Sequence, residues 1–528
     1  MPQAPKVLIS DEMSPRAAEI FRERGLHVDI KLGLKPDQLK EIIGGYHGLA
    51  IRSATKVTAD ILGAAKNLKV IGRAGIGVDN VDVPAATSRG VLVMNTPFGN
   101  SVTTAEHAIA LMFGLARQLP AADRSTHEGK WEKNRFMGVE LTGKTLGIVG
   151  CGNIGTIVAD RAKGLRMKVL AFDPYLSPQR ASDLGIEKVE LPELWKRADF
   201  ITLHTPLTDS TRNLLDAKSF AQMKQGVRII NCARGGLINE ADLKIALDSG
   251  QVAGAALDVF EVEPAKKHPL FGNEKVICTP HLGASTEEAQ ENVALQVAEQ
   301  ISDYLLTGTI TNPINMSSVS SAEAPRLKPY MKLAEQLGSF VGQLYDQAIK
   351  SVRIDYEGEA ADLNTRPLTA ALLQGLLAPQ LDGINLVNAP ILAKEREIEV
   401  NEAKTAKSVD YQTRIRLTVI GEKRPFTVCG TLVGGDKPRI IQIDDIALEA
   451  GLGPQMLFVR NIDKPGFVGR LGNIVAEAGI NIATFHLGRA DKGGDSIAFA
   501  QIDEAVGDMV LMQICSLPNV TQVKLLKF

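Results

Sequence analysis

The sequence is poor in several features that would assign it to a specialised class of protein. It has only five cysteines, odd in number, widely spaced and without a Cys-x-x-Cys pair, which suits free thiols in a reducing compartment. Its eight histidines include no His-Glu-x-x-His motif, so we expect no metal site. No apolar run approaches the roughly 18 residues that cross a bilayer, and the first ten residues lack the features of a secretory signal. We therefore expect a cytoplasmic protein that does not enter a membrane.

Charge of neither sign dominates the chain. Its 528 residues carry 59 Lys and Arg against 61 Asp and Glu, for a formal net charge of -2. A nucleic-acid-binding protein normally needs a basic excess to displace counterions from phosphates, so we expect no nucleic-acid partner. The length allows roughly three to four domains of ~150 residues each.

Short apolar runs alternate with helical stretches in the first 300 residues. Runs such as KVLIS and VLVMN indicate repeated βαβ units and a parallel sheet. A second series of the same kind starts at Lys144 with KTLGIVG. The helical stretch SVTTAEHAIALMFGLARQL between them is expected to begin at a Ser101 or Thr103 cap, with Glu106 completing a capping box. The sequence thus predicts two doubly wound α/β modules in succession.

The last 200 residues follow a different pattern. A Ser/Pro-rich stretch at 312–325 indicates a domain boundary. Two helical stretches followed by alternating, antiparallel-type strands are expected between about 329 and 452, which indicates an α+β domain. From Met456 to Phe528 the order is strand, helix, strand, strand, helix, strand, which is the ferredoxin-like βαββαβ plan.

The strongest single motif is a glycine-rich turn after the first strand of the second module. Gly150, Gly152 and Gly155 form Gly-x-Gly-x-x-Gly between a strand and a helix, where a pyrophosphate can approach the backbone and the helix N-terminus. Asp173 ends the next strand, 18 residues beyond Gly155, and would bind the adenosine ribose. Its charge would repel the 2′-phosphate of NADP, so the pattern predicts NAD. A structural turn that binds nothing is the alternative.

Three charged or titratable residues follow strands of the same module, namely Arg234, Glu263 and His281. Ligands of open α/β sheets lie beyond the carboxyl ends of the strands, so these side chains should share one crevice with the cofactor. An imidazole can take the hydroxyl proton when an alcohol loses hydride, a carboxylate can orient it, and a guanidinium can bind a substrate carboxylate. We assign these roles to His281, Glu263 and Arg234 in that order. Structural ion pairs or a helix cap are the alternatives.

Several strings resemble the D-2-hydroxyacid dehydrogenase family, among them GRAGIGVDNVD, LTGKTLGIVGCGNIG, NCARGGLI, AALDVFEVEP and TPHLGASTEEAQ, and the match covers most of residues 1–310. The resemblance is greatest to members that oxidise 3-phosphoglycerate with NAD at the start of serine synthesis. It implies the catalytic set Arg234, Glu263 and His281. Ile76 departs from the threonine of some relatives near the nicotinamide. The implied cofactor contacts are Gly150, Gly152, Asn153, Ile154, Gly155, Asp173, Thr205, Cys232, Ala233, Arg234, Asp258, His281, Gly283 and Ala284.

The resemblance places substrate binding mainly in the first module. A phosphoglycerate carries a phosphate and a carboxylate, and a cluster of cations would bind both. Solvated surface charge is the alternative for Arg52, Lys133 and Arg135. The expected contacts are Arg52, Ser53, Arg73, Asn100, Lys133 and Arg135.

The resemblance also implies a domain plan. The helix after TPHLGAST is expected to return to the first domain, and closure around the crossings near Pro97 and Gly283 would exclude water. The expected domains are a flavodoxin-like substrate-binding domain (1–98 and 284–310), a Rossmann NAD-binding domain (99–283), an intervening regulatory or oligomerisation domain (318–452) and a ferredoxin-like ACT domain (455–528).

ACT domains bind small amino acids between two copies, and the string NIDKPGFVGRLGNIVAEAGINI resembles them. The implied effector contacts are Asn461, Asp463 and Asn481, and serine is the expected effector and feedback inhibitor. A purely oligomerising domain is the alternative. In the intervening domain, Lys437 and Arg439 are candidates for contacts with an anionic effector. We expect a homo-oligomer, either a dimer or a tetramer.

Two other functions remain open on the sequence. Some relatives act as NAD-sensing transcriptional corepressors with the same dehydrogenase body. Another 2-hydroxy acid, such as glycerate or 2-hydroxyglutarate, could also be the substrate. The complete set of Arg234, Glu263 and His281 favours an enzyme.

Overall fold

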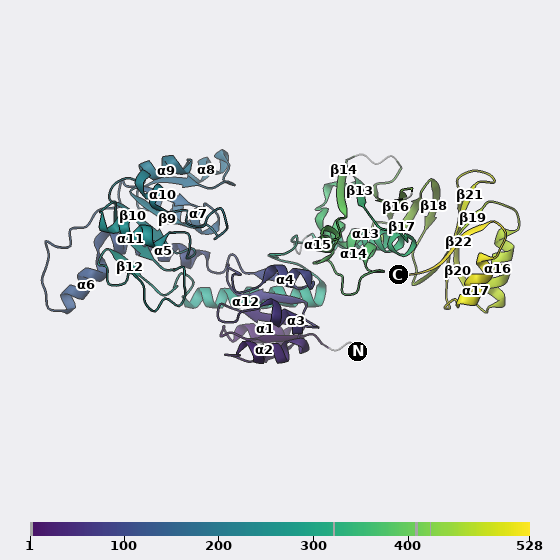
Figure 1. The fold of residues 1–528 in the computed structure, drawn as a ribbon, viewed down its shortest axis with the longest axis horizontal. Coiled ribbons are helices and arrows are strands. Elements are labelled where there is room, and N and C mark those ends of the chain that lie inside the picture. Colours follow the sequence, from purple (N-terminus) through teal and green to yellow (C-terminus); the bar gives the residue numbers. More distant parts are fainter. Residues whose placement is uncertain (1–3, 320–322, 407–409, 423) are drawn as a thin grey trace.

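Four sheets follow one another along the chain in the computed structural model, which describes residues 4–319, 323–406, 410–422 and 424–528 (Figure 1). Within these ranges, no helix is both long and apolar enough to span a lipid bilayer.

The first sheet is parallel and has the strand order β2-β1-β3-β4-β5, which is the flavodoxin-like order. Helix α12 (Glu287–Thr307) comes from much later in the chain and packs on this sheet. A side chain on Gly72 would lie 2.5 Å from Val297 of α12, so the close approach requires glycine. The other elements are β1 (Lys6–Ile9), α1 (Arg16–Glu23), β2 (His27–Ile30), α2 (Pro36–Ile42), the short 3-10 helix Ile43–Gly45, β3 (Gly48–Ile51), α3 (Ala59–Ala64), β4 (Val70–Arg73), α4 (Val83–Ser88) and β5 (Leu92–Asn95).

The second sheet has seven parallel strands in the order β12-β11-β10-β9-β6-β7-β8. This order is that of a Rossmann sheet with one added strand, and the strand order reverses beside β6. The prediction of two doubly wound modules is therefore confirmed. The elements are β6 (Thr145–Val149), α7 (Asn153–Gly164), β7 (Lys168–Phe172), α8 (Pro178–Leu184), β8 (Glu187–Lys188), α9 (Leu191–Arg197), β9 (Phe200–Leu203), α10 (Ala217–Gln222), β10 (Val227–Asn231), α11 (Glu240–Asp248), β11 (Val252–Leu257) and β12 (Val276–Cys278).

Helices α5 (Ser101–Arg117) and α6 (Leu119–His127) lead from the first sheet into the second. The predicted capping box of α5 is wrong. Its N-cap is Asn100, whose side chain makes no capping bond, while Ser101 Oγ donates to the carbonyl of Pro97 at 2.9 Å and Thr103 contacts Thr286. Both hydroxyls lie inside the first turn of α5. Ser101 bonds back to a carbonyl four residues earlier, and Thr103 bonds to the N-cap residue of α12.

The third sheet has the order β14-β13-β15-β16-β17-β18, with β13 and β14 parallel and the other pairs antiparallel. The prediction placed both helices before all strands and is wrong on this point, because β13 lies between α13 and α14. The first helix also begins earlier than predicted and contains Pro329. The elements are α13 (Ala324–Leu344), β13 (Ser351–Gly358), the 3-10 helix Glu359–Asp362, α14 (Arg366–Leu377), α15 (Ala389–Glu395), β14 (Glu399–Thr405), β15 (Thr413–Ile420), β16 (Phe426–Val433), β17 (Lys437–Ile443) and β18 (Ile446–Ala450).

The fourth sheet is antiparallel, with the order β20-β21-β19-β22, so the predicted βαββαβ plan is confirmed. Helices α16 and α17 pack on one face. On the other face, Phe458 and Phe499 contact Phe340 of α13, with ring centroids 5.9 and 5.8 Å away. The elements are β19 (Gln455–Ile462), α16 (Phe467–Glu477), β20 (Ile482–Arg489), β21 (Asp495–Ile502), α17 (Asp508–Cys515) and β22 (Val520–Lys527).

Candidate active site

The glycine-rich turn lies between β6 and α7. Gly150 has a φ of 92°, which favours glycine, and a side chain there would lie 2.5 Å from the carbonyl oxygen of His204. A side chain on Gly155 would lie 2.1 Å from the carbonyl oxygen of Gly150. At Gly152, the N-cap of α7, no atom lies within 4 Å of the Cβ position and no side chain caps the helix. The turn therefore leaves open space beside helix N–H groups, which fits the pyrophosphate of NAD.

Asp173 lies at the end of β7, beside this turn. Its carboxylate oxygens accept the backbone N–H groups of Cys151, at 2.8 Å, and Tyr175, at 2.7 Å. Each oxygen keeps a lone pair that a ribose hydroxyl can use. The next two residues, Pro174 and Tyr175, are uncharged, so this edge of the site suits NAD better than NADP.

The remaining expected cofactor contacts also lie at the start of α7 or at the carboxyl ends of strands. Asn153 and Ile154 begin α7. Thr205 follows β9, Cys232 and Ala233 follow β10, Asp258 follows β11, and Gly283 and Ala284 follow β12.

Glu263 and His281 form a direct pair, although 18 residues separate them. His281 Nδ1 lies 2.7 Å from Glu263 Oε2, and Glu263 Oε1 accepts the backbone N–H of Phe260 at 2.9 Å. Burial raises the pKa of Glu263, but the hydrogen bonds from His281 and Phe260 outweigh burial, and the pKa lies below its ordinary value. The structure thus holds a charged carboxylate against one imidazole nitrogen.

Asp258 anchors the loop that carries His281. Its buried carboxylate accepts the backbone N–H groups of Leu282, at 2.7 Å, and Gly283, at 2.8 Å, and the hydroxyl of Thr279, at 2.6 Å. Its backbone carbonyl accepts the N–H of His281 at 2.9 Å. Burial raises the pKa of Asp258, but the hydrogen bonds prevail and the pKa is lowered. The loop is therefore held by both the side chain and the backbone of one residue.

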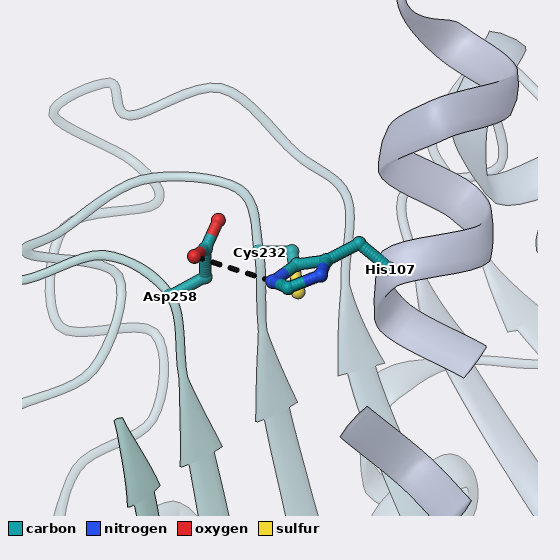
Figure 2. Close-up of side chains that lie close together, drawn as sticks. All are labelled: His107, Cys232 and Asp258. Atoms are coloured by element: carbon teal, nitrogen blue, oxygen red, sulfur yellow. Dashed lines mark ion pairs between the residues drawn. The ribbon is translucent and has the colours of Figure 1, made fainter. Parts of the chain in front are cut away.

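His107 of α5 and Cys232 complete a buried cluster around Asp258 (Figure 2). His107 Nε2 lies 3.3 Å from Asp258 Oδ1, and one ligand atom from each of the three residues lies within 4.8 Å of the others. Burial raises the pKa of the Cys232 thiol well above its ordinary value, so the sulfur stays protonated. The carboxylate of Asp258 already accepts three other donors, so the cluster acts as a hydrogen-bonded anchor.

His107 was not predicted from the sequence. Its only signal was its position on the same face of α5 as Thr104, which donates to the carbonyl of Gly283 at 2.7 Å.

Arg234 joins the two modules. Its Nε donates to Asp79 Oδ2 at 3.0 Å, and its Nη1 donates to the carbonyl of Ala233 at 2.6 Å. A side chain on Gly77 would lie 1.9 Å from Arg234 Nη2, so the guanidinium lies directly against the loop after β4. This contact places Arg234, which belongs to the second sheet, beside the expected substrate residues of the first.

Two arginines of the first module lie close to Arg234. Burial lowers the pKa of Arg73 to about 10, and the nearby positive charges of Arg234 and Arg52 add to the effect. Arg73 Nη1 donates to the carbonyl of Ala74, and its buried Nε has no partner within the described parts of the chain. Arg52 Nη1 donates to the carbonyl of Glu12 at 3.0 Å. Three guanidinium groups that mostly bond to backbone carbonyls therefore gather at the junction, an arrangement that suits an anionic ligand.

Comparison with known proteins places the chain in a family. Residues 109–283 match the NAD-binding domain of D-isomer specific 2-hydroxyacid dehydrogenases, and residues 326–444 match the D-3-phosphoglycerate dehydrogenase intervening domain. The D-3-phosphoglycerate dehydrogenase of Synechocystis sp. is 43% identical over 517 residues, which are 98% of this chain and 93% of that protein. The chain belongs to the D-3-phosphoglycerate dehydrogenase family. It is therefore an NAD-dependent oxidoreductase, and the corepressor alternative is not favoured.

A further relative agrees with membership of the D-3-phosphoglycerate dehydrogenase family, and solved structures share the fold over part of the chain. The D-3-phosphoglycerate dehydrogenase of Methanocaldococcus jannaschii is 43% identical over 522 residues, covering 98% of this chain and 99% of that protein. The TT0316 protein of Thermus thermophilus is similar in structure, with a TM-score of 0.54 and 34% identity, over 58% of this chain and 99% of that one. The apo-structure of D-lactate dehydrogenase from Escherichia coli gives a TM-score of 0.52 at 30% identity, with coverages of 58% and 99%.

Not every expected substrate residue of this family member lies at the junction. Ser53 is exposed beside Arg52, and Asn100 is buried, with no partner among the described residues for its Oδ1 atom. Lys133 and Arg135 lie on the segment that follows α6. Helix α6 lies at the end of the second module that is remote from the first (Figure 1). Arg135 pairs there with Glu132 at 2.7 Å and Glu274 at 2.5 Å. The structure therefore does not bring Lys133 or Arg135 to the arginine cluster within one chain.

The expected effector residues are also only partly brought together. A pocket of about 620 Å³ is lined by Asn461 and Asp463, together with Gly466, Arg489 and Ser496 among others. Asn461 is 2% exposed, and its Oδ1 has no partner in the described chain, while Asp463 pairs with Arg489 at 2.7 Å. Asn481 lies outside this pocket, near the start of β20, where it bonds to Asp503 and Glu504.

Proposed function

We propose that the chain oxidises D-3-phosphoglycerate to 3-phosphohydroxypyruvate with NAD, the first step of phosphorylated L-serine synthesis. The observation that carries this proposal is the junction of the modules. A Glu263–His281 pair comes from one side, and Arg52 and Arg73 come from the other. Relatives named D-3-phosphoglycerate dehydrogenase, 43% identical over nearly the whole chain, support the choice of substrate.

The proposed proton path uses His281 and Glu263. Because Glu263 occupies Nδ1 of His281 at 2.7 Å, Nε2 is the nitrogen left to take the proton of the substrate hydroxyl. The adjacent carboxylate stabilises the imidazolium that forms and holds the ring in place. NAD, when bound, accepts the hydride.

Arg234 and the first module bind the two anionic groups in this scheme. A guanidinium can hold a carboxylate through two parallel hydrogen bonds, and we assign Arg234 to the carboxylate beside the reacting carbon. Arg52 and Arg73 then take the phosphate, with Ser53 and Asn100 as polar neighbours. The ion pair of Arg234 with Asp79 would give way to the substrate carboxylate.

We assign cofactor binding to the glycine turn and the strand ends of the second sheet. Gly150, Gly152 and Gly155 would admit the pyrophosphate, with Asn153 and Ile154 at the first turn of α7, and Asp173 would bind the ribose. The residues that would surround the rest of the dinucleotide are Thr205, Cys232, Ala233, Arg234, Asp258, His281, Gly283 and Ala284.

A substrate panel tests the proposal directly. With NAD present, 3-phosphoglycerate should give a kcat/KM far above those of glycerate and 2-hydroxyglutarate, because only the first carries a second anion for Arg52 and Arg73. Equal or better turnover of an unphosphorylated hydroxy acid would reject the substrate assignment. An absence of turnover on every acid, together with a stable protein partner in a pull-down, would favour the corepressor function.

We also propose that serine binds at the fourth sheet and inhibits the enzyme. The buried Asn461 offers an unpartnered carbonyl oxygen to an ammonium or hydroxyl group, and Asp463 and Arg489 in the same pocket carry opposite charges that suit a zwitterion. Asn481 would contact the bound serine from a second copy of the chain. Serine titration should lower activity and raise the Tm, and Asn461→Ala should weaken both effects. If serine changes neither the activity nor the Tm, the fourth sheet would have an oligomerising role instead.

The proposed enzyme is a homo-oligomer, a dimer or a tetramer. Trp131 is 88% exposed and Met137 is 77% exposed, and apolar side chains this exposed suit contact with a second copy. Lys133 and Arg135 lie on the same segment, and we propose that they serve a partner's site. All five cysteines are free thiols, which suits the cytoplasm.

The four-domain plan given by the sequence is retained as part of the proposal, with boundaries at 1–98 with 284–310, 99–283, 318–452 and 455–528. The four sheets and the packing of α12 on the first sheet support it.

A further inference from the structure

The segment 258–275, which carries Glu263, contains no helix or strand. It runs from the end of β11 at Leu257 to the start of β12 at Val276. Backbone ladders therefore do not hold Glu263 in place, although its carboxylate must stay within hydrogen-bond distance of His281. Within this segment, the side chain of Glu263 itself accepts the N–H of Phe260 at 2.9 Å. The position of Glu263 thus depends on the turn 260–263.

A second carboxylate–histidine pair holds that turn. Glu240, the first residue of α11, uses both carboxylate oxygens: Oε1 accepts the backbone N–H of Glu261 at 2.9 Å, and Oε2 lies 2.7 Å from His268 Nε2. The Glu240 and His268 side chains are only 18% and 11% exposed, so solvent screens this pair far less than the surface ion pairs. Glu240 therefore links the rigid start of a helix to the residue two positions before Glu263.

The far end of the pair is held as well. His268 Nδ1 accepts the N–H of Leu270 at 3.3 Å, which leaves Nε2 as the nitrogen that donates to Glu240. The imidazole ring lies against Phe260 and Phe271, with centroids 5.2 and 5.4 Å away. Phe260 is the residue whose N–H holds Glu263, so the ring supports the turn from a second side.

The same turn contacts the segment that carries Arg234. A side chain on Gly235 would lie 1.8 Å from the carbonyl oxygen of Phe260. Any outward shift of residues 260–261 would therefore change the packing beside Arg234 as well as the position of Glu263. The contacts of this partly buried pair thus lead to two of the three residues to which the chemistry is assigned.

We infer that Glu240 and His268 are positioning residues, which hold the turn 260–263 so that Glu263 meets His281; this inference rests on the catalytic roles proposed above. Neither residue touches the reacting atoms in this scheme. Glu240 presents two acceptors to two donors, the N–H of Glu261 and the Nε2–H of His268. Glutamine at this position has one acceptor and one donor group, so one of the two contacts must be lost.

The test compares variants of the full-length chain by kcat, with enzyme concentration normalised to NAD-binding sites by fluorescence titration. Glu240→Gln and His268→Leu should lower kcat about tenfold or more, because small displacements of catalytic groups are costly, while the Kd of NAD stays within about twofold. His268→Gln, which keeps a donor for Glu240, should retain more activity than His268→Leu. Asp248→Asn is the matched control, because it removes an exposed ion pair with Lys244 on the same helix, and it should leave kcat unchanged.

A double-mutant cycle separates positioning from a general loss of structure. If Glu240 acts through Glu263, Glu240→Gln should add almost nothing to the loss already caused by Glu263→Gln. Additive losses, or wild-type kcat in Glu240→Gln, would overturn the inference. Wild-type kcat in Glu263→Gln alone would instead reject the proposed catalytic roles, so the two failures are distinguishable.

Discussion

The two parallel sheets are built alike, yet the polar residues that they bring to their junction differ in kind. The first sheet contributes cations, Arg52 and Arg73, whose hydrogen-bond partners are mainly backbone carbonyls. The second contributes a glycine turn and the Glu263–His281 pair. The loops of that pair are held by two carboxylates, the buried Asp258 and the partly buried Glu240. A cation can attract an anion even when its side chain moves somewhat. Proton transfer, in contrast, requires donor and acceptor to stay within hydrogen-bond distance.

The largest expected effect lies in the second module. His281→Ala should lower kcat by about 10²–10⁴-fold, because it removes the group that takes the proton, while the Kd of NAD stays within about twofold. Steady-state kinetics and fluorescence titration measure the two quantities. His127→Ala, which replaces a histidine that is 83% exposed on α6, is the control. Unchanged turnover in His281→Ala would remove the functional difference between the two sheets.

Substitutions in the first module should change the KM for the substrate rather than kcat. Arg52→Ala should raise the KM for 3-phosphoglycerate about tenfold to a hundredfold, the effect of losing a hydrogen bond between charged groups, and leave the KM for NAD within about twofold. Arg22→Ala, on the exposed side of α1, serves as the control. Equal increases for substrate and cofactor would show that Arg52 does not belong to the substrate side.

A smaller effect is expected at the far edge of the second sheet. Asp173→Ala should weaken NAD binding about tenfold and reduce the discrimination against NADP, because the repelling charge is gone. Binding of both cofactors by calorimetry measures this change, with the exposed Asp183→Ala on α8 as a control. Full retention of NAD selectivity would place the discrimination elsewhere.

The smallest effect concerns stability. The pKa of Asp258 is lowered in the folded state from its ordinary 3.8, so its stabilising contribution is fully present above that value and is lost as the pH falls through the folded pKa. Asp258→Asn should lower the free energy of unfolding by about 1–3 kcal/mol at pH 7. The difference from wild type should shrink below pH 3.8, because the protonated acid resembles the amide. Urea denaturation at pH 7 and below pH 3.8 tests this, with Asp209→Asn as the exposed control. A difference in the free energy of unfolding that stays the same at the two pH values would contradict the prediction.

Prediction from the sequence placed residues correctly wherever their position depends on the order of elements. The Gly150 turn, Asp173 and the Glu263–His281 pair all follow strands, and the carboxyl ends of parallel strands meet at one edge of a sheet. Prediction failed where a side chain has more than one available partner. Ser101 and Thr103 look like caps, yet they bond to Pro97 and Thr286. Asn481 and Asp463 share one motif but lie apart in a single chain.

The residues that support the site could not be inferred from local pattern. His107, Glu240 and His268 belong to three separate segments. Only His107 has a local signal, its position on the same face of α5 as Thr104. Their contacts form only because α5, α11 and the segment 258–275 pack together, which partly buries each group beside a hydrogen-bond partner.

The sequence by itself determined the two parallel sheets, the ferredoxin-like end of the chain and the choice of NAD, because periodicity and glycine spacing are local properties. It also predicted which side chains react. Tertiary structure alone decided how Arg234 meets the first module, which carboxylates hold the loops of Glu263 and His281, and that Lys133 and Arg135 lie away from the arginine cluster. Those outcomes depend on which groups are desolvated together, and only the packed chain sets that.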